Sequence, residues 1–447
     1  MTTPPLASPS QFRRLAVLIG VNFVDMMGFM IVLPLLPFYA LKLNASPEIV
    51  GQLIASYSIA QLVAAPLWGR VSDRYGRRPA LLIGLSASAL AYVVFGLADS
   101  LWLLYLSRVV QGAGGGTTGV AQAYVADTVA PADRARALGW LSAATSAGVM
   151  VGPAIGSSAA HFGQEAPGLI AAALCLINVI FAWRWLPESR KQSGSPATKP
   201  QRSIWHPAWM AIRHPTSPVG RLLWIYGVGM IAFSSMTSIM ALYLGAEFAI
   251  DEKTIGYVFL YVGILSFVMR SLLLGPIVDR IGETWAMRIG TGLLVVGLAL
   301  YPLPRDLWTL ALVIPGVPIG TALLFPATTS LMSRYSDPGE LGTTMGVAQT
   351  FAGLARVVAP LLATTLFQRL GHAWPFYAAA IFVALVGIMA FQVEVHPDPS
   401  SERRKERKPD ERRRPDGAPG GAGAGLGSTD TGAGSTAGPR DSGAART

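Results

Sequence analysis

Stretches of about twenty apolar residues recur along most of this chain, and they restrict its fold more than any other feature of the sequence. Each stretch is long enough to cross the hydrocarbon core of a bilayer as a helix, which makes all of its backbone hydrogen bonds internally. Charged residues make up only 13% of the chain, whereas soluble domains carry about 25%. We therefore predict an all-α membrane protein with twelve transmembrane helices, at residues 15–39, 50–68, 80–98, 101–126, 137–160, 167–186, 222–245, 254–276, 284–303, 307–332, 341–367 and 373–393.

A membrane β-barrel and a cleavable signal peptide both fit these stretches poorly. The stretches are longer and more continuously apolar than the strands of an outer-membrane barrel. The first one contains Asp25 and ends in Pro34 and Pro37 without a small-residue cleavage site, so we expect no cleavable signal peptide. The lone Cys175 excludes an intramolecular disulfide and fits no metal-ligand spacing, and we expect neither a metal nor a cofactor.

The net charge of +10 follows the predicted topology. Of the 35 Lys and Arg residues, 28 lie on the side of the termini and the even-numbered loops, if Arg184 and Arg288 near the ends of their spans are counted there; four lie on the other side and three lie deep within helices. This bias is the positive-inside rule, so we predict an inner-membrane protein whose termini both face the cytoplasm. Topology accounts for most of the basicity, and we expect no nucleic-acid partner. The basic segment 403–414 is predicted to be solvated or to rest on anionic lipid headgroups.

The composition divides the chain into four parts. A proline-rich, basic loop at 187–221 joins an N-terminal part at 1–186 to a C-terminal part at 222–393, each with six predicted helices. Residues 394–447 are first rich in charged residues and then in Gly, Ala, Ser and Thr. Such a segment has too little apolar surface to bury, so we predict a disordered tail.

An internal repeat supports the division into two halves. Four residues of one short loop recur 206 positions later in the chain: Gly69, Asp73, Arg74 and Gly76 match Gly275, Asp279, Arg280 and Gly282. Four identities in register within one loop are hard to obtain by chance. We therefore predict two pseudo-symmetric six-helix bundles that descend from one unit, an arrangement common among secondary transporters.

The first copy of the repeated loop, residues 69–78, has the sequence GRVSDRYGRR and lies between the second and third predicted helices. Its glycines permit a tight turn and close helix approach, its aspartate can face helix N-termini, and its arginines can meet carboxylates or lipid phosphates. A loop that only satisfied the positive-inside rule would not require this spacing. We predict gating roles for Gly69, Asp73, Arg74, Gly76, Arg77, Arg78, Asp127, Asp279 and Arg280.

A stripe of small residues marks the fifth predicted helix. Gly148, Gly152 and Gly156 are spaced by four, so they share one face against which a neighbouring helix can approach closely. Pro153 interrupts the backbone hydrogen bonds of this helix and introduces a bend. Tight packing and a moving gate are equally compatible with the pattern, and we include these four residues among the gating candidates.

These motifs resemble those of the major facilitator superfamily. The 69–78 loop matches its G-x-x-x-D-R-x-G-R-R pattern at every specified position, and residues 108–112, RVVQG, match a motif of its fourth helix. The helix 5 pattern resembles the signature of the antiporter branch. Asp25-Met26-Met27-Gly28, followed by two prolines, is similar to the first helix of bacterial drug/proton antiporters, including tetracycline exporters. The resemblance implies a seal between the halves at helix 5 and a part for Arg108 in proton coupling.

Charged residues inside the predicted helices are few. Of the 25 acidic residues, Asp25 alone lies well inside a helix, and Arg108, Arg270 and Arg356 share that depth. A charge at the bilayer centre costs about 3 kcal/mol on insertion scales, so each of them needs a partner or a wet cavity. A static ion pair between Asp25 and Arg108 would meet that need. We favour proton coupling by these two residues, because Asp25 is the one obvious group here able to gain and lose a proton at ordinary pH.

The remaining intramembrane residues give a less specific signal. Arg270 is open between a binding role and snorkelling toward the cytoplasm. The predicted third and ninth helices lack the additional acidic residues of the tetracycline exporters, which argues against tetracycline. Three arginines against one aspartate favour an anionic or zwitterionic solute. The substrate-binding candidates, each also compatible with ordinary packing, are Asn22, Asp25, Met26, Tyr57, Arg270, Arg356, Phe233, Tyr261 and Phe325.

The sequence therefore favours a monomeric secondary transporter that exchanges a small organic compound for protons by alternating access. The proton gradient is the expected energy source. A proton symporter or a uniporter for an organic anion is an alternative within transport. A receptor or assembly factor that moves no solute is an alternative of another class. We expect no enzyme activity, since no nucleotide loop, metal cluster or catalytic triad is recognisable.

Overall fold

The computed structural model describes residues 9–130, 133–189, 217–336 and 340–393, and every regular element in them is a helix. The described helices belong to one compact unit. Most of the predicted linker and the whole predicted tail lie outside the described residues.

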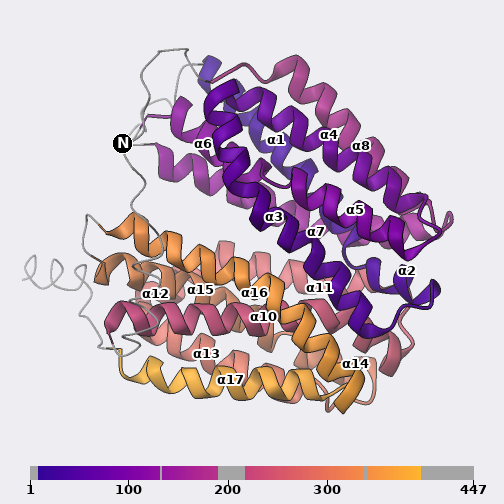
Figure 1. Ribbon diagram of the computed structural model, residues 1–447. Coiled ribbons are helices and arrows are strands. Elements are labelled where there is room, and N and C mark those ends of the chain that lie inside the picture. Colours follow the sequence, from indigo (N-terminus) through magenta and orange to yellow (C-terminus); the bar gives the residue numbers. More distant parts are fainter. Residues whose placement is uncertain (1–8, 131–132, 190–216, 337–339, 394–447) are drawn as a thin grey trace, which may run out of the picture. The chain divides into compact units, whose positions relative to one another are not determined.

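The first half contains eight helical segments, the indigo-to-magenta ribbons of Figure 1. Proline sets the break in the first predicted span, because α1 ends two residues before Pro34 and α2 begins with Pro37 in its first turn. The segments are α1 (Pro9–Val32), α2 (Leu36–Lys42), α3 (Pro47–Tyr75), α4 (Arg77–Gly96), α5 (Leu101–Gly114), α6 (Thr117–Thr128), α7 (Arg134–Ala160) and α8 (Ala166–Trp185).

The second half repeats this order with its own interruptions. Ser217 starts it as an N-cap, whose side chain accepts a hydrogen bond from the Gly220 amide at 3.0 Å. The segments are α10 (Pro218–Phe248), α11 (Ile255–Val268), the π-helical turn η1 (Met269–Leu273), α12 (Leu274–Ile281), α13 (Glu283–Leu300), α14 (Leu307–Val313), α15 (Gly316–Tyr335), α16 (Leu341–Leu370) and α17 (Trp374–Phe391).

All twelve predicted spans coincide with helical segments, and within the described residues eleven of them are long and apolar enough to cross a membrane. The exception is the span predicted at 101–126. Three successive glycines, Gly114 to Gly116, divide it into α5 and α6. Glycine is the poorest helix former after proline, so a run of three is a natural site for a break.

Small residues let the helices of each half approach closely. Gly148 and Gly152 of α7 face the backbone of α1 around Met27, and Gly156 faces Ile31. A Cβ atom at any of these glycines would lie within 3.0 Å of α1 atoms. The predicted close approach of a neighbouring helix is thus present, and the partner of the glycine stripe is α1 of the same half rather than a helix of the opposite half.

Two helix pairs make most of the contact between the halves, α3 with α16 and α7 with α11. Gly51 of α3 lies against Thr364 and the Pro360 carbonyl of α16. In the same way, Gly256 of α11 lies against Ser157 and the Pro153 carbonyl of α7. The two contacts follow one plan, in which a glycine of one half meets a Pro-x-x-x-Ser/Thr turn of the other.

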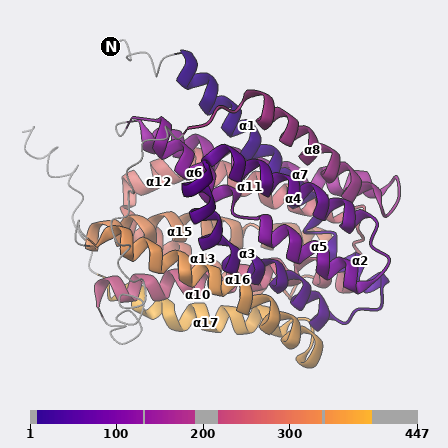
Figure 2. The same cartoon turned by 45° about the horizontal axis from the view of Figure 1, so that its top comes forward.

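Polar contacts also hold the halves together, at the end of the bundle where these glycine contacts lie. Ser157 accepts a hydrogen bond from the Gly256 amide and donates one to the Glu252 carbonyl, each at 2.8 Å. Lys42 pairs with Glu252, and Arg369 pairs with Glu48 at 2.9 Å. We call this the closed end; it carries the label α2 in Figures 1 and 2.

Ion pairs at the other end join residues within one half. Among the described residues there, Arg77 pairs with Asp73 and Asp127 of its own half, and Arg334 pairs with Glu283 of its own half. This end carries the labels α6 and α12. The described ion pairs that cross between the halves are therefore concentrated at the closed end.

Alanine at Gly51 or Gly256 is expected to push the closed end apart, because the added Cβ would overlap atoms of the opposite half. Overpacking of this kind costs about 1–3 kcal/mol. The measurement is the rate at which a short bifunctional thiol reagent links Lys42→Cys to Glu252→Cys in a Cys175→Ser background. Gly292→Ala is the matched control, since its Cβ would meet no atom within 4 Å. Equal linking rates in all three glycine variants would contradict this role for the two glycines.

Candidate functional site

A cavity of about 180 Å³ lies between the two halves. Its first-half wall comes from α1, α2, α3 and α5, and its second-half wall comes from α10, α11 and α16. Aromatic rings and short hydroxyl side chains dominate the wall, with Phe29, Phe233 and Phe259 among the rings. A mostly apolar cavity with a few polar groups is what a binding site for a small organic molecule requires.

Four of the residues that the sequence singled out lie in the wall of this cavity. They are Tyr57 and Arg108 from the first half, and Phe233 and Arg356 from the second. Tyr57 packs on Phe29 with ring centroids 5.0 Å apart. The cavity therefore brings together residues that are up to about 300 positions apart in the chain, which no local pattern could have grouped.

The other predicted binding residues lie outside this wall. Met26 packs on Gly148, and Asn22 donates hydrogen bonds to the Leu141 carbonyl and to Thr145 Oγ1, so both connect α1 to α7. The Tyr261 hydroxyl donates to the Ala311 carbonyl at 3.0 Å. Phe325 lies one layer further out.

Two of these outlying residues, Phe325 and Arg270, belong to the second half. The ring of Phe325 packs edge-on against Phe233, with centroids 6.2 Å apart, and so supports a wall residue from behind. Arg270 lies on the exposed surface of the helices, in the π-helical turn η1. Turns of this type break the regular ladder of helical hydrogen bonds and are frequent at functional sites.

Asp25 occupies a small buried pocket of its own inside the first half. The pocket is lined by α1, α4 and α6, through residues such as Asn22, Leu85 and Ala121. Thr117 Oγ1 donates a hydrogen bond of 2.9 Å to the Asp25 carboxylate. Asp25 is only 7% exposed. The break between α5 and α6 helps to form this pocket, because Thr117 is the first residue of α6.

Arg108 and Asp25 do not form the static ion pair that the sequence left open. Arg108 is 1% exposed, its Nη2 donates to Ser107 at 3.1 Å, and its guanidinium lies over the Phe95 ring at 5.4 Å. The Nε and Nη1 atoms make no hydrogen bond within the described part of the chain. The two residues that the sequence grouped as one coupling pair thus occupy separate places, Arg108 in the cavity wall and Asp25 behind it.

Tyr92 and Gln111 lie between these two places, and sequence reasoning did not single them out. Gln111 is one helical turn from Arg108 and donates a hydrogen bond of 2.7 Å to the Tyr92 hydroxyl. The Tyr92 ring in turn packs against Gly28, one turn after Asp25. Gln111 belongs to the RVVQG motif, which was the only available signal, while Tyr92 stands in an apolar stretch and gave none.

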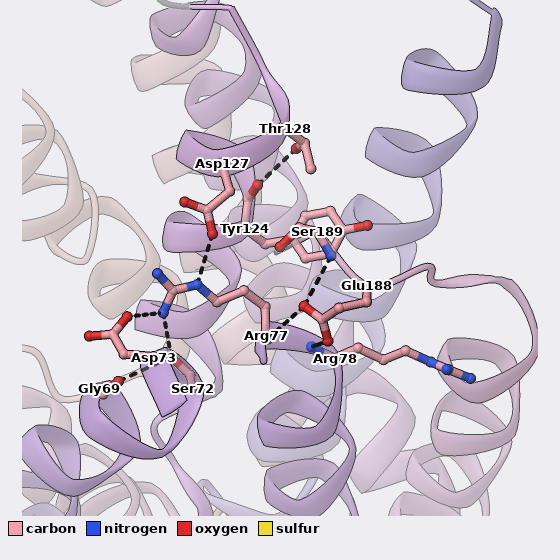
Figure 3. A network of polar contacts seen from close by, with 10 residues as sticks. All are labelled: Gly69, Ser72, Asp73, Arg77, Arg78, Tyr124, Asp127, Thr128, Glu188 and Ser189. Carbon is pink, nitrogen blue, oxygen red and sulfur yellow. Dashed lines mark hydrogen bonds and ion pairs between the residues drawn. The ribbon is translucent and has the colours of Figure 1, made fainter. Parts of the chain in front are cut away.

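The loop between α3 and α4, which carries the GRVSDRYGRR motif, is organised around Arg77 (Figure 3). Its guanidinium donates to Asp73 at 2.6 Å, to Ser72 at 2.6 Å and, across the half, to Asp127 of α6 at 2.9 Å. The Ser72 hydroxyl donates to the Gly69 carbonyl at 3.3 Å. The structure thus brings together most of the predicted gating residues of the first half.

Glu188 is a further member of this network. Its carboxylate accepts hydrogen bonds from the Arg77 and Arg78 amides at 2.9 and 3.1 Å, where it caps the N-terminus of α4. Gly76 is required beside it, since its φ is +107° and a Cβ would collide with the carboxylate. The sequence placed Glu188 in the linker, because its partner lies 111 positions away.

The second half has the same contact with the charges exchanged. Glu283 directly follows Gly282, as Arg77 follows Gly76, and it pairs with Arg334 at the end of α15 at 2.9 Å. In the first half the cation begins α4 and the anion lies on α6. In the second half the anion begins α13 and the cation lies on α15. Asp279 and Arg280 form none of the ion pairs found between described residues, so their predicted gating role gains no contact here.

Comparison with known proteins places this architecture in a family. The model of the Major Facilitator Superfamily matches residues 18–317 and 222–428. The chain belongs to the Major Facilitator Superfamily. It is therefore a secondary transporter with the twelve-helix, two-bundle fold expected from the sequence, and a multi-pass membrane protein.

Individual members of the superfamily resemble the chain along most of its length. Tetracycline resistance protein, class B, of Escherichia coli is 27% identical over 368 residues, which is 81% of this chain and 90% of that protein. Multidrug resistance protein 2 of Bacillus subtilis (strain 168) is 28% identical over 381 residues, which is 83% of this chain and 92% of that protein. These relatives agree with the predicted resemblance to the drug/proton antiporter branch.

Solved structures confirm the superfamily fold. The human organic anion transporter MFSD10 (TETRAN) superposes with a TM-score of 0.64 at 22% identity, over 86% of this chain and 100% of that one. A bacterial homologue of the human lysosomal transporter Spinster gives a TM-score of 0.69 at 14% identity, over 87% of this chain and 97% of that one.

The reversed order of charge in the two ion pairs can be tested by exchanging the charges of Arg77 and Asp127. Arg77→Glu places a carboxylate against Asp73 and Asp127, and we expect it to lower the free energy of unfolding by about 1–3 kcal/mol. Adding Asp127→Arg recreates the order found at Glu283 and Arg334, and should recover most of the loss. The measurement is the thermal melting of the purified protein together with its transport rate. Arg70→Glu is the control, because Arg70 is exposed and takes part in no ion pair between described residues. A double variant as damaged as the single one would contradict the pairing.

Proposed function

We propose that this chain is a proton-coupled antiporter that exports a small organic compound by alternating access. The observation that carries this proposal is a cavity between the two halves. Among the described residues, the ion pairs that join one half to the other lie at one end of the bundle. A cavity with this geometry can be offered to either side of a membrane if the halves rock about it. The similarity to resistance proteins for tetracycline and for multiple drugs supports export as the direction.

We propose Asp25 as the group that carries the proton. Its carboxylate is buried beside Thr117, and no cation of the described part of the chain lies within ion-pair distance. A titratable group in such a place, without a paired cation, meets the requirement for a proton carrier. Because α1 packs on α7 and α7 touches the opposite half at Gly256, a movement of the halves would reach the Asp25 pocket through these helices.

We propose that the closed end faces the outside and that both termini face the cytoplasm. The excess of Lys and Arg in the even-numbered loops supports this orientation. The cavity then belongs to an inward-facing state, ready to receive a compound from the cytoplasm. In this state Arg108 lies in the cavity wall, and the pair Gln111–Tyr92 lies between it and the Asp25 pocket.

Replacement of Asp25 by Asn tests the proposal. Asn keeps the size of the side chain and an acceptor for Thr117, but it cannot release a proton in the physiological range. A growth-inhibition screen of a compound panel first identifies an exported compound, and proteoliposomes with an internal pH dye then measure proton movement on its addition. We expect the variant to lose compound-driven proton movement down to background, while the wild type exchanges the two in opposite directions.

One control variant and three contrary outcomes complete this test. Glu247→Gln removes an exposed acidic group at the end of α10 and should leave proton movement intact. Normal coupling in Asp25→Asn would remove Asp25 from the mechanism. Movement of protons and compound in the same direction would establish a symporter instead. A chain that moves no compound of a broad panel would favour the receptor or assembly factor.

A further inference from the structure

We infer that the central cavity binds a small aromatic carboxylate, held by Arg108 of the first half and Arg356 of the second. This inference rests on the proposed transport function for its physiological meaning, and it names the substrate class of that site. Binding itself can be measured without any transport, which separates the two claims.

The charges of the cavity wall point to an anion. Arg108 and Arg356 both line the cavity, and the described residues of its lining include no aspartate or glutamate. The intramembrane acid, Asp25, lines a different pocket. Arg108 is buried and Arg356 is exposed, and the two positive charges flank a mostly apolar space, where they attract an anion and repel an organic cation.

Of the two arginines, Arg108 gives the stronger reason to expect a bound anion. It is 99% buried, and its Nε and Nη1 donors have no partner among the described residues. A buried cation without an anion is costly, and unsatisfied donors add to that cost. Each of these two nitrogens forms one edge of the guanidinium together with Nη2, and either edge can donate to the two oxygens of a carboxylate.

The rest of the wall selects the body of the ligand. Phe29, Tyr57, Phe233 and Phe259 supply aromatic surface, and Ser234 and Thr237 supply hydroxyls. The volume of about 180 Å³ slightly exceeds the roughly 150 Å³ of an apolar cavity known to hold benzene. One aromatic ring with a carboxylate therefore fits both the size and the chemistry of the space.

The positions of the two arginines add a consequence for transport. Because each half supplies one of them, a carboxylate between them would hold the halves together across the cavity. Export of one anion in exchange for one inward proton moves two positive charges inward. An inside-negative potential of 100 mV would then favour export by about three orders of magnitude at equilibrium, whereas a one-for-one exchange of a monovalent cation for a proton would be electrically neutral.

The test compares three ligands of nearly equal shape on the purified full-length protein in nanodiscs, without a pH gradient. Radiolabelled benzoate, benzylammonium and benzamide carry charges of −1, +1 and 0 on the same ring. We expect benzoate to bind at least about tenfold more tightly than the other two, because it alone offers two negatively charged oxygens to the guanidinium donors. Benzylammonium binding as tightly as benzoate would overturn the inference.

Variants locate the site. Arg108→Gln and Arg356→Gln should each weaken benzoate binding about tenfold or more and leave benzamide binding within about twofold. Arg184→Gln, which removes one exposed arginine at the end of α8, is the matched control and should bind benzoate as the wild type does. Arg108→Lys, which keeps the charge but loses the fork, should fall between the wild type and Arg108→Gln, and it guards against loss of folding. A loss in Arg270→Gln as large as that in Arg356→Gln would place the anion elsewhere and overturn the site.

The binding assay also distinguishes failure of this inference from failure of the proposed function. If Asp25→Asn retains proton coupling, the proposed proton carrier is wrong, yet selective benzoate binding in the same preparation would still support the anion site. If benzoate does not bind but another compound is exchanged for protons, the antiport stands and the anion site is wrong.

Discussion

The close contact of the two halves at Gly51 and Gly256 is the constraint on which the rest of the structure depends. Each glycine lets one helix backbone reach a proline carbonyl and a hydroxyl side chain of the opposite half. The contacts lie at the closed end, together with the Lys42–Glu252 and Glu48–Arg369 ion pairs. The cavity exists because the halves meet there. Surface ion pairs are individually weak, so the close-packed glycine contacts are the more specific part of this seal.

The buried charges of the first half are arranged around this cavity in two layers. Arg108 is in the wall, and Asp25 lies behind it in a small pocket with Thr117. Neither charge neutralises the other in this conformation. A buried charge without a partner is costly, so we propose a separate role for each residue: Arg108 as a cation that meets a solute and Asp25 as an acid that holds a proton.

Pseudo-symmetry explains both what the halves share and where they differ. They share the glycine-ended loop after α3 and α12, and each has an ion pair that ties the N-terminus of its third helix to the end of its fourth. The sign of that pair is exchanged, with Arg77–Asp127 in one half and Glu283–Arg334 in the other. The contact geometry has thus been kept while the residues diverged. The sequence repeat revealed the loops, but the exchanged pair is invisible to a search for identical residues.

The sequence by itself determined the membrane architecture, because lipid leaves only helices for a chain with these apolar stretches and because span length and charge bias are local properties. It also predicted the close packing of the helix 5 glycines and most of the loop network around Arg77. Tertiary structure alone decided that Arg108 and Arg356 share a cavity, that Asp25 does not, and that Glu188, Tyr92 and Gln111 belong to the polar networks. The physical reason is that a helix pattern fixes which face a residue occupies, whereas its neighbours depend on how twelve helices pack across hundreds of positions.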